Sequence, residues 1–496
     1  MPTPSRPASR VSTLTLWGAA FAVLVLLHIP YLKLPYYWDE LGQFVPQTLD
    51  LYNEGRWIPI HTLPNVHPPG VEAMLAFVWI LARGPSILTA RLLMLAIAAF
   101  GVAGSLLLAI RLSRRSAGAP AFAALLLLLA SPLFYTQAMM VQLDMPAMAF
   151  TVWALLFFLD GRLRASVLMA TLAVLMKETA VVLPVVLGAW LIYEERAYRK
   201  AAFYLIPCAA LAAWIAILWG ATGHPLGDPA FGRYNTWYSL HPVRLNAALL
   251  RRIYYLFFAE FRWIGTAALI WAWRKTDWFR NPEWGVAGAF FMAHMLTVSA
   301  FGGAVLERYL CPILPILFAA FGIAWMSLTG RLRILVPGLA VIGSMLSMVW
   351  NPPYPFPYEN NLAMVDFVAI NTLAAEYVEN EPGIGTVATA WPLTDALRRP
   401  EFGYVTKPIA VVELHDFRAA NLLNAEGKHV DALILYSRDW SPPGGWGLRR
   451  IDFIRGFLER YYDYAPPATS AEIEAALGLH SQIRWEHRGM WVEIFR

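Results

Sequence analysis

Long apolar runs across residues 1–350 constrain the fold of this chain more than any other feature of its sequence. A helix needs about 20 mainly apolar residues to cross the hydrocarbon core of a bilayer, and on that criterion the sequence predicts about eleven spans. We expect them near residues 13–29, 86–110, 119–136, 140–159, 164–176, 179–193, 201–221, 253–273, 284–303, 309–329 and 334–350. The chain is therefore predicted to be mainly α, a polytopic bundle of transmembrane helices.

Two of the apolar runs need separate treatment. Arg6 and Arg10 precede the run at 13–29, as in a signal peptide, but that run is long and has no small-residue cleavage site. We therefore interpret it as a retained first span. The run at 69–82 is too short to cross comfortably, and it is predicted to be a helix that lies at the outer interface.

Residues 351–496 have the composition of a soluble domain. The whole chain is 58% hydrophobic and 15% charged, whereas soluble proteins are about 25% charged, and the deficit falls in residues 1–350. Two domains are predicted: a transmembrane domain at 1–350, with its first outer loop at 30–68, and a small α/β domain at 351–496. In the second domain we expect a helix at 362–379 and strands at 385–389, 408–412 and 431–436.

Basic residues recur in alternate loops between the predicted spans. They are Arg111, Arg114, Arg115, Arg162, Arg164, Arg196, Arg199, Lys200, Arg274, Lys275, Arg280, Arg331 and Arg333. The net charge of +5 therefore reports topology rather than a nucleic-acid-binding patch, and no nucleic acid partner is expected. The positive-inside rule places the N-terminus in the cytoplasm, and an odd number of spans puts residues 351–496 outside. The compact loops favour a bacterial source, in which the protein would lie in the inner membrane.

Ionisable side chains cluster at the predicted outer ends of the spans, where charges are costly unless they are paired or hydrated. The first outer loop begins with Tyr36-Tyr37-Trp38-Asp39-Glu40 and closes with His67-Pro68-Pro69. Further candidates are Asp144, Lys177, Glu178, Glu307, Arg308 and Tyr309. Acids and cations together predict a polar cavity at the membrane–water boundary, which suits a lipid-linked phosphate whose tail stays in the bilayer.

Each of these candidates also has a structural interpretation. The aromatic residues at 36–38 could form an interfacial belt, Asp144 could cap the following helix, and His67 could be a satisfied structural histidine. The Lys177-Glu178 and Glu307-Arg308 pairs could be charged turns. Glu260 and Arg262, placed within the span at 253–273, could pair with each other, near Arg251 and Arg252. Cys208 and Cys311 lie in apolar runs and predict no disulfide framework.

The order of these motifs resembles the GT-C superfamily of membrane glycosyltransferases. The nearest branch is that of the protein O-mannosyltransferases, which includes the enzymes that add aminoarabinose to lipid A. The likeness covers roughly residues 13–350 and rests on Trp38-Asp39-Glu40, His67-Pro68-Pro69, Leu143-Asp144-Met145-Pro146, Met176-Lys177-Glu178 and Arg308-Tyr309-Leu310 with Pro312 and Pro315. Two features depart from the family: His67 stands where the lipid A branch usually has lysine, and no β-trefoil insertion occurs.

The resemblance implies that a sugar moves from a polyprenyl phosphate to an acceptor lipid, glycan or protein outside the cytoplasm, with inversion. Asp39 would be the base, with Glu40 and Asp144 as further catalytic acids. Arg308, Lys177, His67 and Arg91 would bind the donor phosphate, while Tyr37, Trp38, Glu178, Glu307 and Tyr309 would line the cavity. Asp39 and Asp144 could together hold a divalent cation, for which carboxylate ligation favours Mg²⁺ or Mn²⁺.

Two other classes of function remain open on the sequence. A transporter or lipid flippase would also use an outward-facing polar cavity, although transporters usually bind substrate near the midplane and often show inverted repeats. A non-enzymatic scaffold would act through the exported residues 351–496 alone. In that segment Trp440, Trp446 and the Pro-Pro-Gly-Gly at 442–445 could form either a carbohydrate-stacking loop or a plain turn.

Overall fold

The computed structural model describes residues 12–113, 118–352, 356–422, 429–437 and 451–496. Several sequence features named above lie outside the described residues: Arg6, Arg10, Arg114, Arg115 and the predicted stacking loop with Trp440 and Trp446. The described chain is mainly helical up to residue 380 and carries a five-stranded sheet formed entirely by residues after 385.

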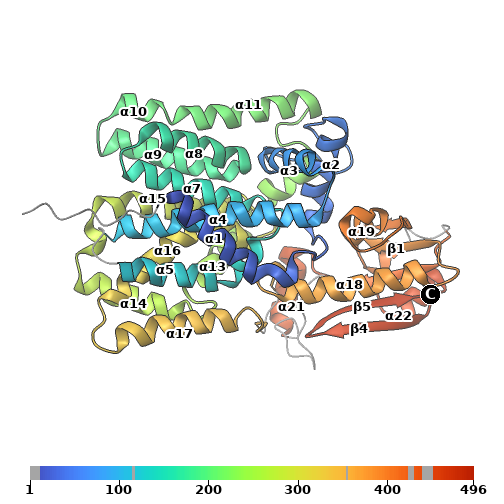
Figure 1. Ribbon diagram of the computed structural model, residues 1–496. Coiled ribbons are helices and arrows are strands. Elements are labelled where there is room, and N and C mark those ends of the chain that lie inside the picture. The colour runs from blue at the N-terminus through green and yellow to red at the C-terminus, as the bar shows by residue number, and fades with distance from the viewer. Residues whose placement is uncertain (1–11, 114–117, 353–355, 423–428, 438–450) are drawn as a thin grey trace, which may run out of the picture.

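Helices pack side by side through the first part of the chain, and the sheet lies at one end of this bundle (Figure 1). The bundle helices are α1 (Thr13–His28), α2 (Val45–Glu54), α3 (Gly70–Ala82), α4 (Ile87–Leu112), α5 (Gly118–Ala130), α6 (Pro132–Gln137), α7 (Asp144–Leu159), α8 (Leu163–Met176), α9 (Val182–Tyr193), α10 (Tyr198–Ala202), α11 (Leu205–Thr222), α12 (Pro229–Arg233), α13 (Pro242–Phe257), α14 (Trp263–Lys275), α15 (Pro282–Ala300), α16 (Leu314–Met326) and α17 (Leu332–Leu346). The short helix α6 is completely buried, and most residues of the longer helices α7 and α16 are buried as well.

Every apolar run that was predicted to span contains helix, but three runs are interrupted. The run at 201–221 includes the end of α10 at Ala202 and continues as α11 from Leu205. The run at 119–136 divides at Ser131, where Pro132 begins α6. The run at 253–273 is not continuous, because α13 ends at Phe257 and α14 begins at Trp263. Glu260 and Arg262 were therefore wrongly placed within a span: they lie at the turn between the two helices. Their predicted pairing is confirmed, with Arg262 Nη2 2.6 Å from Glu260 Oε2.

Length alone does not fix how many of these helices cross a membrane. Among the described residues, four helices are long and apolar enough to cross: Thr13–Tyr31, Ile87–Leu112, Tyr198–Thr222 and Glu307–Met326. Shorter apolar helices accompany them, including the predicted interfacial helix at Gly70–Ala82. The count of about eleven spans stays a prediction. One feature of the predicted topology can be compared with the structure. Arg111 pairs with Asp160 at 3.0 Å and with Glu283, so three loops that were predicted to lie on the same side of the membrane are in contact.

The sheet combines parallel and antiparallel strands in the order β2-β1-β3-β5-β4. These strands are β1 (Thr386–Ala390), β2 (Ala410–Leu414), β3 (Ala432–Tyr436), β4 (Ser481–His487) and β5 (Met490–Phe495). The first three run parallel and lie where the sequence predicts strands, whereas the antiparallel hairpin of β4 and β5 was missed. Its signal was Arg488-Gly489, with positive φ at both residues, between two runs that carry Trp, Ile and Val.

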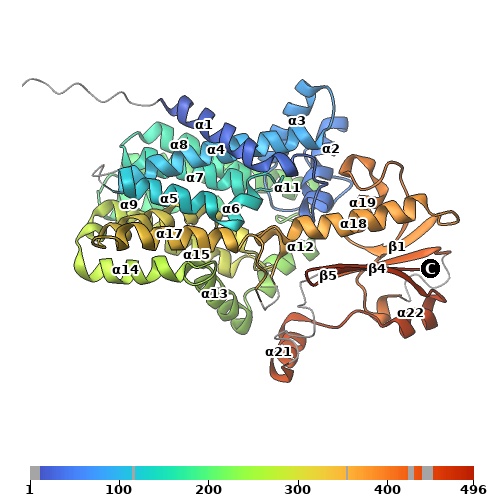
Figure 2. The same ribbon diagram turned by 60° about the horizontal axis from the view of Figure 1, so that its bottom comes forward.

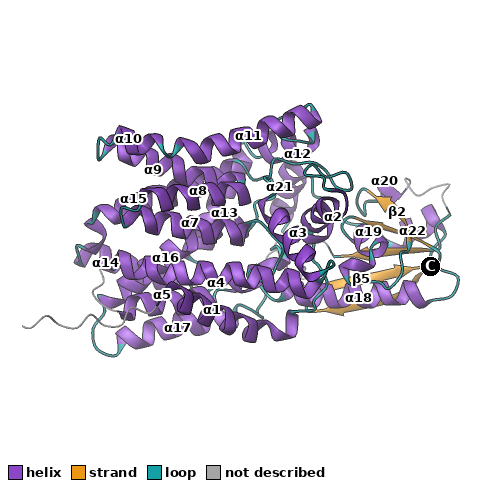
Figure 3. Ribbon diagram, turned by 45° about the horizontal axis from the view of Figure 1, so that its top comes forward, coloured by secondary structure: helices purple, strands orange, loops and turns teal. Residues whose placement is uncertain are grey.

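Helices lie on both faces of this sheet (Figure 2). Helix α18 (Ala363–Asn380) packs on β3, β4 and β5 and corresponds to the helix expected at 362–379. The others are α19 (Leu393–Arg398), α20 (Ala419–Leu422), α21 (Asp452–Tyr462) and α22 (Ser470–Leu477). Figure 2 shows α18 and α19 on one face of the sheet and α22 on the other, while α21 stands apart from the sheet. Figure 3 shows the strands at one end of the helical bundle.

The segment at 30–68, called the first loop below, joins the bundle to the sheet end. Tyr36 N–H donates to the carbonyl of Phe402 at 3.2 Å, and the Tyr404 hydroxyl donates to the Tyr36 carbonyl at 2.9 Å. Gly42 lies directly against the indole of Trp391, and a Cβ at this position would overlap that ring. Close backbone approach of this kind is possible only at glycine.

Replacing Gly42 with alanine should therefore destabilise the contact between the first loop and the sheet end. The overlap with Trp391 forces a shift of either the ring or the loop, which costs about 1–3 kcal/mol in a packed interior. Denaturant unfolding of the detergent-purified protein measures this change. Gly18→Ala is the matched control, because a Cβ at Gly18 meets nothing within 4 Å. Equal stability of the two variants would contradict the close approach.

Candidate active site

A cavity of about 730 Å³ opens at the end of the bundle that faces the sheet. Its walls come from the first loop, the start of α7, the short helices η3 (Glu178–Val181), η4 (Tyr234–Tyr238) and η6 (Glu307–Ile313), and Trp391. The sequence-predicted site residues that line it are Trp38, Asp39, His67, Asp144, Lys177, Glu178, Arg308 and Tyr309. Residues from widely separated segments of the chain thus meet in one place.

Breaks in the helices aim the charged side chains into this cavity. Trp38 has a φ of 48°, which turns the chain just before Asp39 starts the short π-helix η2 (Glu40–Phe44). Lys177 is extended between α8 and η3, and Asp144 is the first residue of α7. Arg308 lies in η6, which contains Pro312 and follows a left-handed Val305. Each of these charged residues therefore lies at a helix end or a break between helices, in the wall of the cavity.

Arg308 is the centre of the charge cluster. Its guanidinium is 4% exposed and contacts three carboxylates: Nη2 pairs with Asp39, Nε lies 3.1 Å from Asp144 Oδ2, and Nη1 donates to Glu359 at 2.7 and 2.8 Å. A planar guanidinium can bind several carboxylates at once because its five N–H groups point outward in fixed directions. Arg308 therefore sets the spacing of all three acids.

Lys177 completes the ionic contacts of Asp144. Its Nζ donates to Asp144 Oδ1 at 2.5 Å and lies 4.0 Å from the ring centre of Tyr309. The two oxygens of Asp144 are thus divided between Lys177 and Arg308. Asp39, with a side chain 13% exposed against 4% for Asp144, is the more accessible carboxylate.

His67 pairs with Glu178 across the cavity wall. Its Nδ1 lies 2.6 Å from Glu178 Oε2, and both side chains are less than one-fifth exposed. The imidazole also meets the ring of Phe231 edge-on at 5.7 Å. This pair lies beside the Arg308 cluster and faces the same cavity.

Glu40 and Arg91 lie elsewhere. Both are completely buried and pair with each other, and neither is among the residues described as lining the cavity. Glu40 also accepts from the backbone N–H of Tyr37 at 2.9 Å and of Val141 at 2.6 Å. With these partners Glu40 has no access to a reactant, so the geometry gives the pair a structural role in holding the first loop on the bundle.

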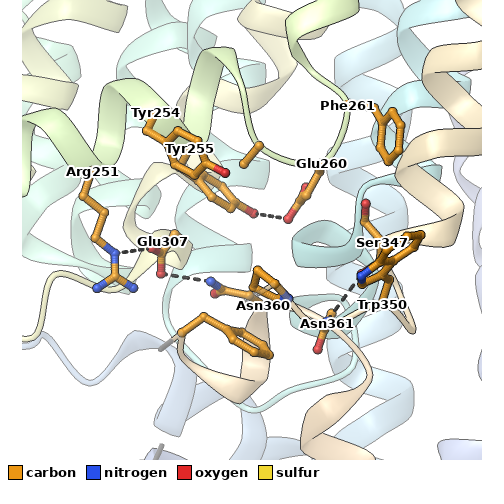
Figure 4. Close-up of a pocket in the computed structure, with 13 residues that line it drawn as sticks. Arg251, Tyr254, Tyr255, Glu260, Phe261, Glu307, Ser347, Trp350, Asn360 and Asn361 are labelled. Carbon is orange, nitrogen blue, oxygen red and sulfur yellow. Dashed lines mark hydrogen bonds and ion pairs between the residues drawn. The ribbon is translucent and has the colours of Figure 1, made fainter. Parts of the chain in front are cut away.

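Tyr37 and Glu307 are also placed outside this cavity. The ring of Tyr37 packs against Trp38 and Phe367, and burial raises the pKa of its phenol well above the ordinary value. Glu307 lines a smaller cavity of about 240 Å³, shown in Figure 4, where it accepts from Arg251 Nε at 2.6 Å and Asn360 Nδ2 at 3.0 Å. Neighbouring residues 307 and 308 therefore face different cavities.

Two residues of the site were not predicted from the sequence. Glu359, in η7 (Tyr358–Asn360), is 2% exposed and reaches Arg308 from beyond the last bundle helix. Burial raises the pKa of its carboxyl to about 7, against the opposing effect of Arg308. Trp391 follows β1 and meets Trp38 edge-on at 5.5 Å. Both come from the segment after residue 350, where no local pattern indicated a role in a cavity of the bundle.

The charge cluster does not fit a divalent cation held by Asp39 and Asp144. Arg308 already bridges these carboxylates, and Lys177 takes the remaining oxygen of Asp144. A different group of side chains has ligand types that bind divalent cations. Asp50, Glu54 and His61 each offer one ligand atom, and these three atoms lie within 4.8 Å of one another. A divalent cation is chemically plausible there, away from the residues that line the cavity.

Arg91→Met should destabilise the protein strongly. The change leaves the carboxylate of Glu40 buried without its cation, which costs about 3–5 kcal/mol for pairs of this kind. Denaturant unfolding in detergent gives the value. Asp277→Asn is the control, since the Asp277–Arg280 pair is 80% and 84% exposed and such pairs contribute at most about 1 kcal/mol. A loss no larger than that of the control would show that the buried pair does not hold the first loop.

No protein-family model and no curated protein sequence matches this chain. Among solved structures, ArnT from Cupriavidus metallidurans bound to undecaprenyl phosphate is similar with a TM-score of 0.55 and 15% identity, over 96% of this chain and 98% of that one. Its apo state matches with the same score and identity, over 97% and 98%. The oligosaccharyltransferase AglB from Archaeoglobus fulgidus is similar with a TM-score of 0.49 and 12% identity, over 85% of this chain and 69% of that one. The chain therefore shares the fold of ArnT over almost its whole length.

Proposed function

We propose that this protein is a glycosyltransferase that moves a sugar from a polyprenyl phosphate to an acceptor, with inversion at the anomeric carbon. The observation that carries the proposal is the cavity itself, in which Arg308 and Lys177 lie beside the accessible carboxylate of Asp39. A transfer by direct displacement needs a base for the acceptor and cations for the leaving phosphate, and both are within one cavity.

An apolar wall supports a lipid-linked donor. Leu211 and Ile215 of α11 and Phe301 after α15 line the same cavity as the charges. A polyprenyl chain would lie along this wall, while its phosphate reaches Arg308 and Lys177. The structure of ArnT with undecaprenyl phosphate concerns a protein of this fold, which agrees with such a donor.

The proposed steps use the residues in the following order. The donor phosphate approaches Arg308 and Lys177, which exchange part of their carboxylate contacts for phosphate oxygens. Asp39 accepts the proton of the acceptor nucleophile as this attacks the anomeric carbon, and the phosphate leaves from the opposite face. Negative charge grows on the phosphate in the transition state, where the two cations stabilise it. Asp144 orients Lys177 and Arg308.

The proposed location follows from the basic loops. Positive residues favour the cytoplasmic side, so the end of the bundle that carries the sheet and the cavity would lie outside the cytoplasm. In a bacterium this is the periplasmic face of the inner membrane. Acceptors there include lipids, glycans and proteins, and a membrane lipid that bears a sugar is the simplest to reach from this position.

Asp39→Asn should abolish transfer while the protein stays folded, because the amide keeps the size of the side chain and cannot accept the proton. Loss of a general base typically lowers the rate by about 10²–10⁴-fold. The measurement is transfer of label by the purified protein in liposomes, from a panel of radiolabelled polyprenyl-phosphate sugars to an envelope extract.

The control for this experiment is Asp277→Asn, because Asp277 is 80% exposed and is not among the residues that line the cavity. Full activity in Asp39→Asn would refute the assignment of the base. No transfer from any donor by folded wild-type protein, with an extract shown to be competent, would favour a transporter instead.

A further inference from the structure

Glu359 occupies an unusual position for a buried acid. It belongs to the segment between α17 and α18, yet its side chain reaches the cluster in the bundle. Thr136 Oγ1 donates to its backbone carbonyl at 2.5 Å, which ties this segment to α6. Gln142 Nε2 lies 3.3 Å from its Oε2, and Arg308 Nη1 donates to both of its oxygens. The carboxylate is therefore held from two sides and aimed at Arg308.

Because the guanidinium of Arg308 is planar, its contact with Glu359 also affects its contacts with the two aspartates. Nη1, Nη2 and Nε lie in one rigid plane, so an anchor on Nη1 fixes the directions in which the other two point. Glu359 holds Nη1, while Nη2 pairs with Asp39 and Nε lies near Asp144. Removing the anchor would free Arg308 to rotate away from the two aspartates.

The side chains in direct ionic contact within the cluster are three acids and two cations. Asp39, Asp144 and Glu359 face the cations Arg308 and Lys177. A donor phosphate would add further negative charge to the same two cations. In a buried site this is costly unless one of the acids gives up its contact or takes up a proton.

Glu359 is suited to take up that proton. The pKa of its carboxyl is raised to about 7 overall, because burial, Asp39 and Asp144 raise it more than Arg308 and the Gln142 amide lower it. Tyr37 and Cys311 are the other titratable groups that interact with this carboxylate. An approaching phosphate would raise the pKa again, so that the acid becomes neutral as the donor binds.

We propose that Glu359 is a positioning residue that orients Arg308 towards Asp39 and Asp144 and competes with the donor phosphate for it. The proposal rests on the proposed function. It has two consequences of opposite sign: without the carboxylate, the phosphate binds more tightly, and the misaligned Arg308 supports slower transfer. A residue that only stabilises the fold would weaken both.

The test uses full-length protein in detergent and radiolabelled undecaprenyl phosphate as the probe, with binding measured from pH 6 to pH 8.5. We expect Glu359→Gln to bind the probe about tenfold more tightly at pH 8.5, the factor expected for one hydrogen bond to a charged group. The difference from wild type should shrink towards pH 6, where the wild-type carboxyl is protonated. Transfer by the same variant should be about tenfold slower.

Two further variants distinguish an effect of the Glu359 carboxylate from a general loss of folding. Glu359→Asp keeps the titratable group and should retain the wild-type pH dependence. Gln142→Leu removes an amide that stabilises the charged form of Glu359, so the pH dependence of binding should move to higher pH. Glu376→Gln, at an exposed position of α18, is the control and should behave as wild type.

The possible results separate the two proposals. Weaker binding together with slower transfer in Glu359→Gln, or no change in either, would overturn the positioning role. The same conclusion follows if folded Gln142→Leu leaves the pH dependence unchanged. Absence of probe binding by the wild type at every pH would instead refute the proposed function.

Discussion

The contact of Arg308 with three carboxylates is the interaction on which the candidate site depends. A guanidinium that is nearly inaccessible to water is stable only when anions replace its hydration, and here Asp39, Asp144 and Glu359 do so from three separate segments. The charges also hold each other in place, because Arg308 is the cation of Asp39 and Glu359, and Asp144 is divided between Arg308 and Lys177. The ion pairs that keep these buried charges stable are therefore the same contacts that set the geometry of the site.

A second buried pair holds the frame around that cluster. Glu40 and Arg91 are completely buried and fasten the start of the first loop to α4 and to the backbone before α7. Because Asp39 immediately precedes Glu40, this anchor also determines where Asp39 lies. The two adjacent acids therefore differ in position: Glu40 is buried inside the protein, and Asp39 lines the cavity. The segment after residue 350 adds Trp391 to the cavity wall and Glu359 to the contacts of Arg308.

Much of the helical architecture could be predicted because apolar length is a local signal. Helices α1, α4, α7 and α11 lie within a few residues of the runs that predicted them. The break at Phe258–Arg262 was missed, because an apolar run that contains a turn has the same composition as one that does not. The strand pair β4–β5 was missed although it carried a local signal, the Arg488-Gly489 turn between two runs rich in strand-forming residues. The count of spans and the orientation stay predictions.

The sequence by itself determined which residues are unusual: charged side chains next to apolar runs are costly, and this cost marks Asp39, Asp144, Lys177 and Arg308 without any knowledge of their partners. Only the tertiary structure decided how they are paired. It joined Glu40 to Arg91 within the protein, turned Glu307 and Arg308 towards different cavities, and brought Glu359 to the site across the connection between bundle and sheet. The physical reason is that the price of a buried charge depends on its own surroundings, whereas the partner that neutralises it can come from any part of the chain.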